Sequence, residues 1–106
     1  MLECLVGNSD GTLTAYYGYV NSESSPVTIP VGANNQFSPA PVDRGQPTTF
    51  NPGETPYWPE SAFSVTFSGP SLSWTLNGIT VTADVNSTPC AYQIFIEKLW
   101  FDLRNN

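Results

Sequence analysis

The sequence contains little charge, and positive charge is the scarcest. Only 11% of its 106 residues are charged, whereas about 25% is usual for a soluble domain. Three basic residues stand against nine acidic ones, which gives a net charge of −6. Nucleic acids and anionic membranes attract proteins through clustered Lys and Arg, so we expect neither as a partner. No apolar run approaches the roughly 20 residues of a spanning helix, so we also expect no membrane insertion.

Catalytic signatures are missing as well. The sequence has no histidine, no cluster with the spacing of a metal site and no nucleophile in a recognisable setting. No two of its acidic residues stand out as the pair of a glycosidase. We therefore expect a protein that is not an enzyme and has no cofactor or metal. The one oxygen-rich cluster, residues 8–11 (NSDG), either ligates calcium or forms an ordinary hairpin loop.

Only two cysteines are present, Cys4 and Cys90. They either form a disulfide, which indicates a secreted or cell-surface protein, or remain as two buried thiols in a cytosolic domain. A composition rich in Thr, Ser, Asn and Pro and poor in Lys favours the disulfide and an extracellular location. Met1 leads directly into a strand-like segment instead of a signal peptide, so we expect either the mature form of a secreted protein or a form expressed without its signal peptide.

The strongest local pattern lies in residues 71–84. Residues 71–76 (SLSWTL) and 79–84 (ITVTAD) both alternate polar and apolar side chains, and Asn77-Gly78 separates them. Asn-Gly accepts the positive φ angles of a type I′ turn, so the pattern predicts a β-hairpin. Both apolar sets then share one face, and the rest of the chain must cover it because an isolated hairpin is marginal in water.

Short strand-like segments recur along the whole chain, separated by turns that contain Pro and Gly. They are residues 2–6, 12–20, 26–31, 47–50 and 62–67, followed by the hairpin. Residues 32–41 are expected to be irregular. Strands at spacings of about 8–12 residues predict an all-β fold, an antiparallel β-sandwich of immunoglobulin-like type with about seven or eight strands and one disulfide; a small barrel is the lesser option. The expected core consists of Leu5, Leu13, Ala15, Tyr17, Val27, Ile29, Phe50, Phe63, Val65, Phe67, Leu72, Trp74, Leu76, Ile79, Val81 and Ile94.

Several runs, together with Cys90, carry a resemblance to a known kind of module. The runs are GNSDGTLTAYYGYVN, VTIPVGANNQFSPAPVDRGQPTTFNPG, FSVTF and LSWTLNGITVTAD. Residues 3–90 resemble a repeated β-sandwich module of large secreted or cell-surface microbial proteins. The resemblance carries no assigned activity and implies a non-catalytic structural or adhesive part. We therefore expect residues 1–90 to form the module and residues 91–106 to be a tail outside it.

The tail has its own pattern. Tyr92, Ile94 and Ile96 alternate with other residues as in a strand, and the apolar residues after them follow helical spacing. The tail either completes the sheet of its own domain or packs on a neighbouring subunit by strand addition. The second option predicts a self-assembling filament or surface-layer subunit. Its candidate contact residues are Leu99, Trp100, Phe101 and Leu103.

Exposed aromatic rings support an alternative function, that of a carbohydrate-binding module. Flat aromatic side chains stack on sugar rings, although aromatic residues in a sandwich also fill cores and loops. The candidates for stacking are Tyr16, Tyr19, Tyr57 and Trp58.

Two polar motifs have two interpretations each. Asn86 begins the one Asn-x-Ser/Thr sequon, which is either a glycosylation site or a turn before Cys90. Arg44 either recognises a carboxylate ligand or binds carbonyl groups of its own loop and a nearby carboxylate, and so holds a long connection in place.

Overall fold

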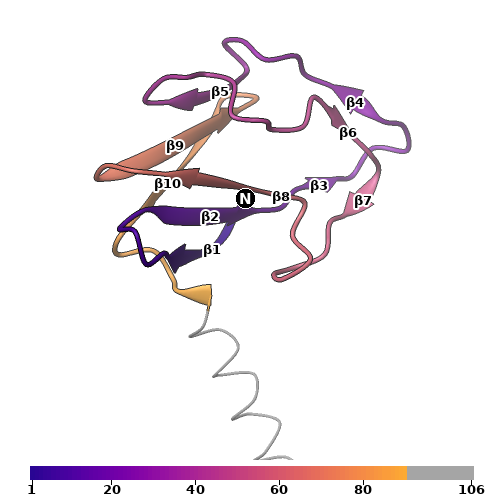
Figure 1. Cartoon of the computed structure of the whole chain (residues 1–106). Helices are drawn as coiled ribbons and strands as arrows, with labels where there is room; N and C mark the ends of the chain where they lie inside the picture. The colour runs from indigo at the N-terminus through magenta and orange to yellow at the C-terminus, as the bar shows by residue number, and fades with distance from the viewer. Residues whose placement is uncertain (91–106) are drawn as a thin grey trace, which may run out of the picture.

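The computed structural model describes residues 1–90, and every element in this range is a β-strand (Figure 1). Ten strands form four small antiparallel sheets, so the all-β prediction is confirmed. Within these residues no helix is long and apolar enough to cross a membrane. Residues 91–106 lie outside the described residues, and with them the strand predicted at residues 92–96 and the contact residues predicted in the tail.

The longer strands belong to two three-stranded sheets. The first has the order β1 (Leu2–Gly7), β2 (Leu13–Tyr17) and β8 (Phe63–Phe67). The second has the order β10 (Ile79–Asp84), β9 (Ser71–Leu76) and β5 (Asn35–Ser38). Two-residue strands make the other sheets: β3 (Val20–Asn21) with β7 (Gly53–Glu54), and β4 (Val27–Thr28) with β6 (Thr49–Phe50).

The hairpin of β9 and β10 forms as the sequence predicts. Leu76 pairs with Ile79 across the turn, and Asn77 and Gly78 have φ angles of 50° and 84°. Both positive values agree with the predicted type I′ turn, whose twist matches the twist of the strands. The hairpin places Trp74 on the inward face, where it is almost fully buried.

Aromatic rings surround Trp74. Phe37 stacks on the indole at 5.9 Å between ring centroids. Tyr17 and Phe63 meet it edge-on at 5.4 and 5.0 Å. Edge-on and offset contacts of this kind add to the free energy gained from burial alone. Because these rings come from β2, β5 and β8, the cluster joins the two larger sheets.

A buried asparagine holds the irregular connections against this cluster. Asn35 is fully buried, and its Oδ1 accepts a hydrogen bond of 3.0 Å from Trp74 Nε1. Its Nδ2 donates to the carbonyls of Ile29 and Pro47 at 2.8 and 2.9 Å. One side chain thus ties β9 to the segments on both sides of the long connection, and it satisfies polar groups that would otherwise be costly to bury.

The predicted disulfide is confirmed. Cys4 in β1 is bonded to Cys90, with Cα atoms 4.9 Å apart, and both cysteines are buried. The Leu5 amide donates to the Thr88 carbonyl at 2.9 Å beside it. The bridge therefore fastens the first strand to the last described segment.

Two strand predictions were wrong. Residues 12–20 do not form one strand, because β2 ends at Tyr17 and β3 begins only at Val20. Between them Gly18 still exchanges backbone hydrogen bonds with Met1, but the Tyr19 amide donates to Thr55 Oγ1, and the strand is interrupted there. Residues 32–41 are not wholly irregular, since they contain β5. That strand forms because Phe37, opposite Trp74 in the register, stacks on the indole.

Tyr17 gives a prediction that depends on pH. Its ring is buried, and among residues 1–90 its hydroxyl has no hydrogen-bond partner. Burial raises the pKa of this phenol above its usual value of 10.0, and the charge of Arg44 offsets part of the effect. A raised pKa in the folded state means that stability is complete below pH 10 and falls as the pH rises further, because only the unfolded chain ionises.

We therefore expect Tyr17→Phe to change the free energy of unfolding by less than about 1 kcal/mol at pH 7, since no hydrogen bond is lost. Above pH 10 the variant should become more stable than the wild type, by up to about 1.4 kcal/mol per pH unit. Urea denaturation at pH 7, 10 and 11 measures both effects. Equal changes with pH in the free energies of unfolding of the two proteins would contradict the raised pKa of Tyr17.

Candidate functional site

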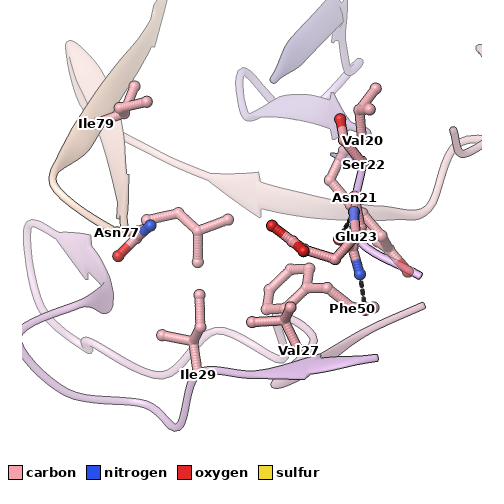
Figure 2. Close-up of a pocket in the computed structure, with 11 residues that line it drawn as sticks. Val20, Asn21, Ser22, Glu23, Val27, Ile29, Phe50, Asn77 and Ile79 are labelled. Carbon is pink, nitrogen blue, oxygen red and sulfur yellow. Dashed lines mark hydrogen bonds between the residues drawn. The ribbon is translucent and has the colours of Figure 1, made fainter. Parts of the chain in front are cut away.

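An apolar groove opens beside the turn of the β9–β10 hairpin (Figure 2). It has a volume of about 480 Å³. The hairpin forms one side, and β3, β4, β6 and the loop after β3 form the other. The lining residues are Tyr19, Val20, Asn21, Ser22, Glu23, Val27, Ile29, Phe50, Leu76, Asn77 and Ile79.

A smaller hollow of about 240 Å³ continues this groove along β10. The two share four lining residues, Tyr19, Val20, Leu76 and Ile79. The smaller part adds Met1, Trp74 and Val81. We treat both parts together as the hairpin groove, which follows the inward face of β10 and then turns toward β3 and β4.

Burial along β10 explains why the groove is open. Ala83 is fully buried, Val81 is half-buried and Ile79 is 70% exposed, although the alternation places all three on one face of the strand. The prediction that Ile79 belongs to the core was therefore wrong. Across the groove Val20 does not cover it, since Val20 is itself 59% exposed. Exposed apolar side chains that cluster in this way mark interaction sites.

Burial along β4 and the loop after it is also lower than predicted. Val27 and Ile29 were expected in the core, but both are only half-buried and line the groove. Among the described residues β4 pairs with β6 alone, so the sheet that carries Val27 has only two strands. Ile94, the last predicted core residue, lies outside the described residues.

Asn21 fixes the wall of the groove on the β3 side. Its Nδ2 donates to the Phe50 carbonyl at 2.8 Å and to the Ser25 carbonyl at 3.1 Å. Its Oδ1 accepts from the Glu23 amide at 2.9 Å. The rings of Tyr19 and Phe50, which also line the groove, pack edge-on with their centroids 4.9 Å apart. A buried amide and two rings therefore position the loop that carries Glu23.

Glu23 is the one charged side chain among the residues that line the groove. Figure 2 shows its carboxylate pointing into the open space, toward the side where Asn77 lies. Apolar walls with a single acidic group suit a ligand that is mainly apolar and carries one positive charge at the matching place.

The four predicted stacking residues do not come together. Tyr16 and Trp58 pack edge-on, with ring centroids 6.3 Å apart and planes at 79°, so these two rings do not form a flat surface. Tyr19 lies in the hairpin groove. Tyr57 does not line the groove and is 60% exposed. The Glu54 side chain raises the pKa of Tyr57 through a hydrogen bond and through its negative charge. Carbohydrate stacking stays a prediction that depends on Tyr57.

Arg44 holds its own loop, as the second of its two interpretations predicts. Its guanidinium donates to the carbonyls of Pro39 and Ala40 at 2.9 and 3.1 Å. It thereby braces the connection between β5 and β6, while Gln46 Nε2 donates to the Val42 carbonyl at 3.0 Å in the same connection. The side chain of Arg44 is thus engaged within the fold.

Residues 8–11 lie in the hairpin loop, residues 8–12, that connects β1 and β2. Asp10 Oδ1 accepts hydrogen bonds from the Thr12 hydroxyl and amide at 2.6 and 3.0 Å, and these bonds lower the pKa of Asp10. Within residues 1–90, no three His, Cys, Asp or Glu side chains are grouped to hold a metal ion. Asn86 is exposed, and its glycosylation stays a prediction.

Sequence reasoning missed the groove, although it named several lining residues as core or strand. Glu23 stood in an unremarkable polar loop, and Val20 stood at the end of an assumed strand. The alternation of residues 79–84 predicts an apolar face, but it does not reveal that this face is buried at Ala83 and exposed at Ile79. No family model, curated protein or solved structure matches this chain.

Proposed function

We propose that this protein is a non-catalytic extracellular module with a structural or adhesive role, and that it self-associates through the hairpin groove. The observation that carries the proposal is the exposure of Ile79 and Val20 at the centre of a continuous apolar groove. Leaving this surface in water costs free energy that a partner recovers by covering it. A filament or a surface layer is the assembly that such a subunit would build.

Other features support an extracellular location and a mechanical role. The Cys4–Cys90 disulfide is stable in oxidising compartments and rare in the cytosol. The bridge and the aromatic cluster around Trp74 connect the first sheet to the rest of the fold. We further propose that the two three-stranded sheets are the layers of an immunoglobulin-like β-sandwich, as the sequence resemblance implies.

The role of the groove can be tested with two matched variants. Ile79→Glu places a charge in the groove, and Val85→Glu places the same charge at a valine that is 74% exposed and does not line it. We expect the wild type and Val85→Glu to assemble as concentration rises. Ile79→Glu should assemble about 10- to 100-fold more weakly, because it loses the burial of one aliphatic side chain.

Sedimentation velocity over a range of concentrations gives the association constants. Near-UV circular dichroism shows whether each variant keeps its aromatic core. A folded Ile79→Glu protein that associates like the wild type would refute the groove as the adhesive surface, and a wild type that stays monomeric at millimolar concentration would refute self-association.

A further inference from the structure

We infer that the hairpin groove is the acceptor for residues 92–98 of a second copy of this chain, added as an antiparallel strand along β10. The inference rests on the proposed function, since it names the partner of the same surface. It depends on three observations: the free edge of β10, the order of apolar and acidic groups along the groove, and the place where the chain leaves the fold.

Strand β10 is at the edge of its sheet. The order β10-β9-β5 leaves one side of β10 without a strand partner in the described part of the chain. Edge strands offer backbone N–H and C=O groups to an incoming segment, while alternate side chains of that segment enter adjacent pockets. The groove lies beside this edge, lined by Ile79 and Val81 of β10.

The sequence of the tail matches the groove in order. Ile94, Ile96 and Lys98 alternate, so in an extended segment they share one face. Among the described residues, no side chain that lines the smaller part of the groove is charged, whereas the larger part contains Glu23. When Ile94 occupies the smaller part and Ile96 the part shared by both, Lys98 lies in the larger part, near the Glu23 carboxylate.

This order also sets the direction of the added strand. Along β10 the chain runs from Ile79, which lines both parts, to Val81, which lines only the smaller part. The incoming segment runs the opposite way, with Ile94 in the smaller part and Lys98 in the larger. The added strand is therefore antiparallel to β10, the arrangement that all the described sheets share.

The chain has few basic residues that could pair with Glu23. Arg44 is the only basic side chain in residues 1–90, and its guanidinium already binds carbonyls of its own loop. Lys98 and Arg104 are the other two basic residues. Of these, Lys98 has the spacing from Ile94 and Ile96 that the groove requires.

The exit of the chain favours a second copy over the same one. Figure 1 shows the orange segment that follows β10 at the end of the molecule opposite the turn between β9 and β10. A donor segment and an acceptor groove at opposite ends form a head-to-tail contact, which joins successive subunits into a ring or into an open filament. Ile94 follows Cys90 by only four residues, which span at most about 14 Å; binding of the segment to the groove of its own molecule is a separate outcome that the experiment must distinguish.

The test uses complementation between two variants of the full chain. Ile79→Glu blocks the acceptor, and Ile96→Asp blocks the donor; Phe95→Asp, on the other face of the segment, is the matched control. At concentrations where the wild type assembles, we expect each blocked variant alone to be monomeric and the mixture to form a one-to-one dimer that does not grow. Phe95→Asp should assemble like the wild type.

A charge exchange tests the register. Lys98→Glu should weaken assembly several-fold, and adding Glu23→Lys to the same chain should restore it. Sedimentation velocity measures all of these variants, with near-UV circular dichroism as the folding control.

Failure of the inference and failure of the proposed function give different results. If Ile79→Glu abolishes assembly but Ile96→Asp assembles like the wild type, the groove is adhesive and the donor is wrong. If the mixture of blocked variants stays monomeric, the segment does not bind between copies, and the inference is overturned. A wild type that never assembles overturns both proposals.

Discussion

Replacing Trp74 with alanine is expected to lower the free energy of unfolding by about 3–5 kcal/mol, the range observed when a large aromatic residue is removed from a packed core. Three rings lose their common neighbour, since Tyr17, Phe37 and Phe63 all contact the indole. Asn35 Oδ1 also loses its donor while it remains buried. Urea denaturation followed by circular dichroism measures the change.

The variant Trp74→Phe separates packing from hydrogen bonding. It keeps an aromatic ring against Phe37 but gives Asn35 no donor, so we expect a loss of about 1–3 kcal/mol from the unsatisfied oxygen together with a small packing term. Domains of this size are stable by only about 5–15 kcal/mol. A loss below about 1 kcal/mol in Trp74→Ala would show that the indole is not the centre of the core.

Removing the disulfide is expected to have an effect of similar size. The bond between Cys4 and Cys90 closes a loop with a sequence separation of 86 residues. In the chain-entropy model a loop of that length contributes about 4–5 kcal/mol, because the bridge restricts the unfolded chain. The double variant Cys4→Ser, Cys90→Ser should lose that amount in urea denaturation.

The reductant provides the control for this experiment. Wild type measured in excess dithiothreitol should fall to the stability of the double serine variant, and the variant itself should not respond to dithiothreitol. Equal stability of the oxidised wild type and the variant would show that the bridge adds nothing to the fold.

The parts of the fold that the sequence predicts are those with short-range signals. The alternation on both sides of Asn77-Gly78 predicts β9 and β10 with the observed turn, and Trp74 is buried as expected. The disulfide followed from the presence of only two cysteines in a composition typical of secreted proteins. In each case a few neighbouring residues or a simple count carry the information.

Features that depend on distant segments could not be predicted. Strand β5 has no alternation that reveals it; it forms because Phe37 stacks on Trp74 and the Asn35 side chain bonds its indole. The exposure of Ile79 depends on how far the segments across the groove, such as the one that carries Val20, reach toward the hairpin turn. The groove was missed for the same reason, since its walls come from segments about 30 to 60 residues apart.

The walls of the groove differ in the number of backbone hydrogen bonds that hold them. One wall is the β9–β10 hairpin, with six residue pairs in register. The other is built from strands of two residues each, β3 with β7 and β4 with β6. Short pairings open locally at a lower free energy than long ones. Hydrogen exchange should accordingly be slow in the hairpin wall and fast in the wall built from the two-residue strands. Ligands of different width would be accommodated by movement of the wall of two-residue strands alone.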